Sequence, residues 1–359
     1  MTKTAVLLLN FGEPEHPTRE EVVPFLERIF AHNAALMGPA TPEQVRARSR
    51  RLAEERADGL IAEYEAIGGS PLPAQAREQA KLLQAELARR GVDAPVLLGM
   101  QFTAPTIAEA LAAARAQGVQ QVVALPVYPL SGPSTTVAAL DEVDAELQTS
   151  GWRVTLHRLS GWHRHPSYLR LRAEAIARVL DAHHLALGDG RTRLVFSAHG
   201  TPMKYLEEGS RYDVYVRDFC ASVAARLEVS DYVIGYQNHA NRPGVRWTQP
   251  EVDAVIAEVD ADAVVVDAVS FMHEQSETLA ELDHELREHA EARGLKFYRV
   301  PVPHAEPEFI GVLADLVEPF ARAAGPLETG TVAIGGVVLR QCRCQPTPGT
   351  HCMNPAIPD

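Results

Sequence analysis

The chain has 359 residues, of which 46% are hydrophobic, and a formal net charge of -13. This length is sufficient for two domains with separate cores, and the acidic balance argues against a nucleic-acid phosphate backbone as the ligand. The apolar run at residues 5–9 is too short for a signal peptide or a membrane span, and no later run approaches the roughly 20 apolar residues of a spanning helix. We therefore expect a cytoplasmic protein.

Short, continuous apolar runs recur along the chain and are typical of parallel strands that are buried on both faces. Amphipathic stretches rich in Ala, Glu, Arg and Leu lie between them and predict crossover helices. The runs are 5–9, 96–100, 122–126, 194–197 and 264–268, and the helical stretches are 73–90, 107–117, 168–182 and 215–227.

This alternation predicts an α/β fold with two Rossmann-like domains, each a parallel sheet flanked by helices, and a cleft at the carboxyl ends of the strands. We place an N-terminal domain at residues 1–150, a C-terminal domain at 151–325 and a C-terminal extension at 326–359 that packs back on the body.

One histidine stands at an expected strand end. His199 follows the buried run 194–197, and Gly200 and Pro202 impose a turn directly after it. A side chain at this point faces the mouth of the cleft, where it can serve as a base or a metal ligand. Packing or capping is the alternative for a lone histidine.

An acidic series follows the next buried run. Glu277, Glu281 and Glu285 are spaced four residues apart on an expected helix and form one ridge that starts at the cleft. A solvated helix face is the alternative, because acidic surface is common in so acidic a protein.

Seven motifs, taken together and in order, resemble those of the ferrochelatases over nearly the whole chain. They are Leu7-Leu-Leu-Asn-Phe-Gly-Glu-Pro14, Tyr64-Glu-Ala-Ile-Gly-Gly-Ser-Pro-Leu72, Leu125-Pro-Val-Tyr-Pro129 with Ser134-Thr-Thr136, Phe196-Ser-Ala-His199, Tyr236-Gln-Asn, Trp247 and Glu277-Thr-Leu. The resemblance implies an enzyme that inserts Fe2+ into a porphyrin, either protoporphyrin IX or coproporphyrin III, in heme biosynthesis, and releases two protons.

The resemblance also implies roles for individual residues. His199 and Glu277 correspond to the catalytic pair, and His199, Glu277, Glu281 and Glu285 would carry the metal, because ferrous iron accepts imidazole and carboxylate ligands. The porphyrin-binding positions that it implies are Met37, Tyr64, Ser70, Tyr128, Ser134, Thr135 and Trp247.

Two departures from the family bear on the site. Gln275 replaces the second histidine of the family's loop before the glutamate, and His273 is a candidate to stand in for it. The polar helix expected over 41–63 replaces an often more apolar lip, so we expect at most weak peripheral contact with a membrane. Its arginines, Arg46, Arg48, Arg50 and Arg51, are candidates to receive propionates.

The four cysteines are unevenly distributed, with Cys342, Cys344 and Cys352 near the C-terminus and Cys220 within the body. This is not the distribution of a disulfide framework and leaves thiols or a metal centre. The tail resembles that of ferrochelatases that hold a [2Fe-2S] cluster, which needs four ligands; Cys220 would be the fourth.

Two other functions fit parts of the pattern. A chelatase of the same architecture could serve another tetrapyrrole or metal, such as cobalt. A carrier could bind a tetrapyrrole without turnover, which the altered loop at Gln275 permits.

Overall fold

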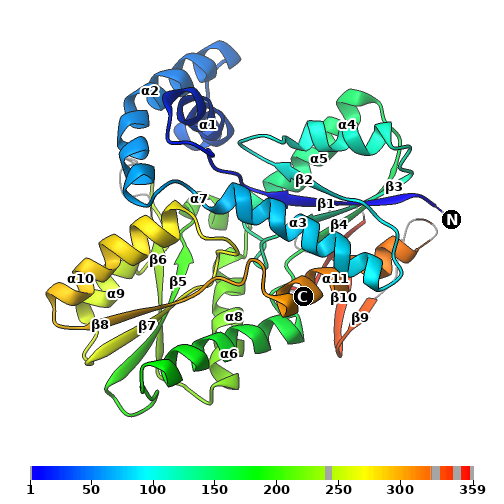
Figure 1. The fold of residues 1–359 in the computed structure, drawn as a ribbon. Coiled ribbons are helices and arrows are strands. Elements are labelled where there is room, and N and C mark those ends of the chain that lie inside the picture. The colour runs from blue at the N-terminus through cyan, green and yellow to red at the C-terminus, as the bar shows by residue number, and fades with distance from the viewer. Residues whose placement is uncertain (1, 239–244, 324, 326–331, 343–348, 356–359) are drawn as a thin grey trace.

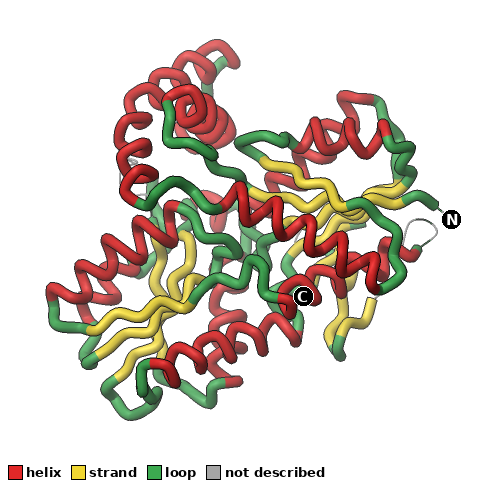
Figure 2. The backbone as a smooth tube through the Cα atoms, viewed as in Figure 1, coloured by secondary structure: helices red, strands yellow, loops and turns green. Residues whose placement is uncertain are grey.

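A computed structural model describes residues 2–238, 245–323, 325, 332–342 and 349–355 and contains two β-sheets, each flanked by helices (Figures 1 and 2). The first is a seven-stranded sheet in the order β2-β1-β3-β4-β11-β10-β9, and the second is a four-stranded sheet in the order β6-β5-β7-β8. The expected α/β architecture with two parallel sheets is confirmed.

The N-terminal sheet is built on four parallel strands: β1 (Thr4–Asn10), β2 (Val96–Met100), β3 (Gln121–Pro126) and β4 (Thr155–Ser160). Every residue of β1 and β3 is buried, which explains why both strands are apolar apart from Thr4, Asn10 and Gln121 at their ends. Helices α3 (Leu72–Arg89), α4 (Ile107–Ala116) and α5 (Ala138–Ser150) belong to the crossovers of this sheet, and η2 (Pro133–Val137) precedes α5.

The C-terminal sheet is parallel throughout, with β5 (Thr192–His199), β6 (Tyr232–Gln237), β7 (Ala263–Ala268) and β8 (Lys296–Val300). Its helices are α6 (Pro166–Ala182), α7 (Met203–Glu207), α8 (Tyr212–Arg226), α9 (Val252–Glu258), the π-helix η3 (Glu277–Leu286) and α10 (Arg287–Ala292).

A helical arm stands away from the N-terminal sheet and approaches the C-terminal domain (Figure 1). It consists of α1 (Arg19–His32), the short η1 (Asn33–Met37) and α2 (Pro42–Ala66), and α2 also contacts η3. The polar sequence of α2 forms a long helix because Thr41 and Gln44 make a capping box and Pro42 occupies the first turn. The arm therefore covers the space between the two domains.

The chain returns to the N-terminal domain at its end. Helix α11 (Pro307–Arg322) packs on α3, and the tail adds β9 (Val332–Ile334), β10 (Val337–Gln341) and β11 (Thr350–Cys352). Strand β11 pairs with β4 in parallel and with β10 in antiparallel orientation. The tail thus completes the N-terminal sheet.

The observed pairing differs from the expected division at residue 150. Strand β4 lies after that boundary and still pairs with β3, so the division between the sheets falls between β4 and α6. The sequence Thr155-Leu-His-Arg-Leu-Ser160 is only partly apolar, because β4 is half-buried over several residues. It therefore lacks the continuous apolar run that predicted its neighbours.

Candidate active site

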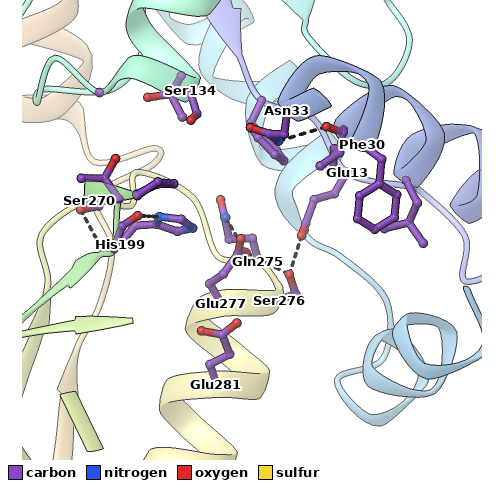
Figure 3. A pocket seen from close by; sticks show the side chains of 18 of the residues that line it. Glu13, Phe30, Asn33, Ser134, His199, Ser270, Gln275, Ser276, Glu277 and Glu281 are labelled. Atoms are coloured by element: carbon purple, nitrogen blue, oxygen red, sulfur yellow. Dashed lines mark hydrogen bonds between the residues drawn. The ribbon is translucent and has the colours of Figure 1, made fainter. Parts of the chain in front are cut away.

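A cavity of about 780 Å³ lies between the two domains and is covered by the helical arm. Its volume is in the range of small-molecule sites. Figure 3 shows side chains of both domains around it. The predicted residues that line it are Met37, Tyr64, Tyr128, Ser134, Thr135, His199, Trp247, Glu277 and Glu281. Residues more than 200 positions apart in the sequence are therefore brought to one site.

His199 is the last residue of β5, and its ring points toward the start of η3 (Figure 3). Its Nδ1 lies 2.6 Å from the carbonyl oxygen of Gly200, which can only accept a hydrogen bond. We therefore assign the ring hydrogen of the neutral imidazole to Nδ1, which makes Nε2 the nitrogen that can accept a proton.

The backbone around His199 is held by a hydroxyl pair. The N–H of His199 donates to Oγ of Ser270 at 3.0 Å, and the hydroxyl of Tyr212 donates to the carbonyl oxygen of His199 at 3.1 Å. The two hydroxyls lie 2.8 Å apart. These contacts fix the end of β5, so that the imidazole is presented from a rigid element.

Glu277 is the first residue of η3. Its Oε2 accepts a hydrogen bond of 2.7 Å from Nε2 of Gln275 and lies 2.9 Å from Oγ of Ser276. Gln275 is buried, so the residue at the position where the resemblance implies a second histidine supplies a neutral donor that orients Glu277. An amide cannot exchange a proton as an imidazole does.

His273, the candidate to stand in for that histidine, does not line the cavity. It is buried, and its Nδ1 accepts from Nδ2 of Asn10 at 3.3 Å. Burial, with a smaller effect from His304, lowers the pKa of His273 to about 3. His273 thus contacts Asn10 of the N-terminal domain from a buried position between the domains.

The acidic ridge extends from the cavity to the surface. Glu281 lines the cavity next to Glu277, and its Oε2 accepts from Nε2 of Gln237 at 2.9 Å. Burial and the charge of Glu277 raise the pKa of Glu281 to about 8. Glu285 is exposed beyond the cavity lining, and desolvation and the charge of Glu63 raise its pKa. The ridge thus joins enclosed and solvated carboxyl groups on one helix.

A further carboxyl group, Glu13, was not predicted as a site residue. It lies just after β1, is 3% exposed and lines the cavity. Burial, followed by the charge of Glu277, raises its pKa to about 7, although three hydroxyl contacts act in the opposite direction. Its position after a buried strand is the signal that identified His199, and the same rule applied to β1 would have found it.

Two predicted porphyrin residues have polar contacts directed at Glu13. The Tyr64 hydroxyl donates to Oε1 of Glu13 at 3.0 Å, and Oγ of Ser70 donates to Oε2. Tyr64 is buried at the cavity wall, whereas Ser70 is not part of the lining. The hydroxyl of Tyr128 is also engaged, because it donates to Oδ1 of Asn10 at 2.9 Å.

The other predicted porphyrin residues differ in exposure. Met37, at the end of η1, is 50% exposed and lines the cavity from the helical arm. Ser134 and Thr135 belong to η2, and Trp247 is half-buried. An apolar and aromatic wall with hydroxyls at its edge suits a flat, largely apolar ligand.

Three of the four arginines proposed for propionates already have carboxylate partners. Arg46 pairs with Glu43, Arg50 with Glu54 and Glu27, and Arg51 with Glu55, while Arg48 donates to the carbonyl oxygen of Ala34. These ion pairs are exposed and therefore weak. A propionate would have to compete with neighbouring glutamates for each of the three guanidinium groups.

Of the tail cysteines, Cys352 lies in β11 and Cys342 directly follows β10. Cys352 is opposite Arg340 in the antiparallel β10–β11 pair, and the N–H of Cys342 donates to the carbonyl oxygen of Thr350 at 2.7 Å. This register places Cys342 and Cys352 diagonally on one face of the sheet. Both are buried.

Cys344 lies outside the described residues, and Cys220 is buried in α8. Within the described part of the chain, no group of three or more His, Cys, Asp or Glu side chains is arranged to hold a metal ion. Cys220 is therefore not gathered with Cys342 and Cys352 in this arrangement.

Comparisons with known proteins agree with the resemblance. A family model described as Ferrochelatase matches residues 3–320. The chain is 35% identical over 354 residues to a ferrochelatase of Synechococcus sp. (strain JA-3-3Ab), covering 95% of this chain and 100% of the relative. It is 33% identical over 321 residues to a ferrochelatase of Geobacter metallireducens, covering 88% and 98%.

Among solved structures, SirB from Bacillus subtilis with Fe3+ matches with a TM-score of 0.48 and 11% identity, over 89% of this chain and 96% of that chain.

Proposed function

The chain belongs to the ferrochelatase family and is an enzyme that inserts ferrous iron into a porphyrin in heme biosynthesis, and from this premise we propose how its residues carry out the insertion. Fe2+ replaces two pyrrole hydrogens, so the site must accept an iron ion and release two protons. The observation that carries the proposal is that the imidazole of His199 and the carboxyl groups of Glu277 and Glu281 line the same cavity.

We propose that His199 accepts the first of the two pyrrole protons. With Nδ1 donating to the Gly200 carbonyl, Nε2 can accept a hydrogen from a pyrrole nitrogen of a porphyrin in the cavity. The second proton leaves through the carboxyl groups of the ridge. The backbone holds the tautomer and the orientation of the His199 imidazole, so little reorganisation accompanies the proton transfer.

We assign iron delivery to Glu285, Glu281 and Glu277, in that order from solvent to cavity. Oxygen ligands suit a divalent iron ion, and neighbouring carboxylates pass a cation inward without stripping all of its ligands at once. The raised pKa of Glu281 supports this assignment. Crowded carboxyl groups hold protons when no cation is present, and they release these protons when a cation binds.

The porphyrin is held, in this proposal, between Met37 on the arm and His199 on the opposite domain, with Tyr64, Tyr128 and Trp247 as further walls. Arg46, Arg50 and Arg51 of α2 already form ion pairs with glutamates and therefore do not indicate how many propionates the site accepts. Protoporphyrin IX and coproporphyrin III both stay candidate substrates.

We propose a cytoplasmic enzyme with at most weak peripheral contact with a membrane. No helix among the described residues is long and apolar enough to cross a bilayer. Met37 is the exposed large apolar residue of the arm and would make the contact.

We also propose a [2Fe-2S] cluster on the tail, with Cys342, Cys344 and Cys352 as ligands. Two of these thiols share one buried sheet face, which suits such a cluster, whereas Cys220 does not fit as the fourth ligand in the arrangement described. Acid-labile sulfide and visible absorption of anaerobically purified protein test the cluster. Loss of both in Cys220→Ser, with a folded protein, would restore Cys220 as the fourth ligand.

Anaerobic assays with Fe2+ and each porphyrin test the function. We expect the free-base spectrum to convert to that of the iron porphyrin, at a higher kcat/KM for one of the two substrates. Binding without conversion would indicate a carrier, and conversion only with Co2+ would indicate another chelatase.

A further inference from the structure

Glu13 gathers hydroxyl groups from three separate segments. Tyr64 on α2, Ser70 in the loop after it and Ser276 before η3 all donate to its carboxylate, and the Ser276 contact to Oε1 is 2.7 Å long. Tyr64 and Ser70 belong to the N-terminal half of the chain, whereas Ser276 belongs to the C-terminal domain. Glu13 is thus a buried contact between the domains at the cavity wall (Figure 3).

Gly12 directs Glu13 into this position. Its φ of +85° favours glycine, and a Cβ at this residue would lie 2.3 Å from Oγ1 of Thr103. The chain therefore turns sharply after β1 and presents the next side chain to the cavity.

Ser276 has one hydroxyl hydrogen and two carboxylate oxygens within reach. Its Oγ lies 2.7 Å from Oε1 of Glu13 and 2.9 Å from Oε2 of Glu277. Because the hydroxyl has a single hydrogen, it cannot donate a full hydrogen bond to both oxygens at once. The shorter distance favours donation to Glu13.

We propose that Glu13 is a positioning residue for iron insertion, which acts by drawing the Ser276 hydroxyl hydrogen away from Glu277. This inference rests on the proposed function of Glu277 as an iron ligand. Glu277 then keeps Gln275 as its donor and retains the lone pairs that a cation needs. Partners that orient a metal-binding carboxylate typically change metal affinity 10- to 100-fold when they are removed.

Removing the acceptor tests the proposal. In Glu13→Ala, Glu277 is the carboxylate that remains within reach of the Ser276 hydroxyl. We expect the KM for Fe2+ to rise about tenfold, with kcat and porphyrin affinity within twofold. Glu13→Gln retains an acceptor oxygen and should restore the KM to within about threefold. Ser276→Ala should change it less than threefold, because its hydrogen is already directed to Glu13.

The double variant Glu13→Ala/Ser276→Ala separates this role from a structural one. If Glu13 acts through the hydroxyl, the double variant behaves like Ser276→Ala alone. A tenfold rise that persists without the hydroxyl, or an equal rise in Glu13→Gln, would overturn the inference. If Glu13→Ala does not fold, a rise above fivefold in Ser276→Ala would overturn it instead.

Glu15→Ala is the matched control, because Glu15 lies two residues away in an exposed ion pair with Arg77. It should leave all kinetic constants unchanged. Porphyrin binding is followed by fluorescence and folding by thermal melting in every variant. If the wild-type protein does not insert iron, the proposed function fails; if it inserts iron and the variants disagree with the pattern above, only the inference fails.

Discussion

Replacing Gly200 by alanine tests whether the end of β5 fixes the imidazole. The N–H of Gly200 donates to the carbonyl oxygen of Gln237 at 2.6 Å, which is already a short contact. A Cβ at Gly200 would lie 2.7 Å from that oxygen and 1.8 Å from Oδ1 of Asn238. The Asn238 side chain can rotate away, but the backbone oxygen cannot, so the ends of β5 and β6 must move apart.

The required movement sets the expected size of the effect. Real Cβ contacts essentially never fall below 3.0 Å, so the strand end shifts by at least the difference between 2.7 and 3.0 Å. Overpacking of this kind costs about 1–3 kcal/mol of stability. The His199 ring is tethered to the carbonyl of Gly200 and moves with it. A misplacement of about 1 Å can cost 10²-fold, so we expect this smaller shift to lower kcat several-fold.

Thermal melting and anaerobic steady-state kinetics measure the two effects on Gly200→Ala. Gly311→Ala is the control, because Gly311 lies within α11 and its added Cβ would have only one distant neighbour, Nη2 of Arg90 at 3.7 Å. A Gly200→Ala enzyme with a normal kcat would refute the view that the strand end positions the imidazole, whatever its stability.

Three further predictions concern single groups. His199→Ala should lower kcat about 10²- to 10⁴-fold and leave porphyrin affinity, measured by fluorescence, within a few-fold; near-normal turnover would exclude its role as base. In the folded protein Glu281 keeps its proton up to about pH 8, whereas in the unfolded chain it loses the proton near its ordinary pKa of 4.5, so the free energy of unfolding falls as pH rises through this interval. Glu281→Gln should make this fall shallower in thermal melts recorded over a series of pH values. An unchanged slope would contradict the raised pKa. Arg172→Met leaves the buried carboxylate of Asp267 unpaired and should cost about 3–5 kcal/mol in urea unfolding, whereas a loss below 1 kcal/mol would show that this pair is dispensable.

The strands that could be predicted are those whose sequences are continuous apolar runs. β3 and β7 are buried along their whole length, so their sequences are continuous apolar runs. The strand β8 has a burial pattern that mixes exposed, half-buried and buried positions, and its sequence Lys296-Phe-Tyr-Arg-Val300 carries no such run. Local patterns therefore predict strands with continuous apolar runs, including the edge strand β2, and miss strands that carry polar side chains, including β4 in the middle of its sheet.

The site residues that could be predicted are those that a pattern within one short segment reveals. His199 after a strand and three glutamates at regular spacing are visible in the sequence, although it does not distinguish an α-helix from the π-helix that forms at Glu277–Leu286. That distinction depends on which carbonyl each N–H reaches. Packing of the whole domain decides it, because the side-chain pattern is compatible with both helices.

The Glu13 contact could not be predicted, because its partners are distant in sequence. Tyr64 and Ser276 lie 51 and 263 residues away from Glu13. Neither hydroxyl has a local pattern that reveals its partner. The fold of the N-terminal domain brings Tyr64 to Glu13, whereas the docking of the two domains brings Ser276 within hydrogen-bonding distance.

Docking of the domains therefore determines the chemistry of the cavity. The N-terminal domain supplies aromatic walls and Glu13, and the C-terminal domain supplies the imidazole and the ridge. The end of the chain returns to the N-terminal domain after the C-terminal domain is complete, because α11 packs on α3 and β11 pairs with β4. Because the Glu13–Ser276 contact spans the domains next to Glu277, a small change in docking reaches the carboxylate that we propose as an iron ligand through a single hydroxyl. The iron step should therefore respond to changes at the domain interface before porphyrin binding does.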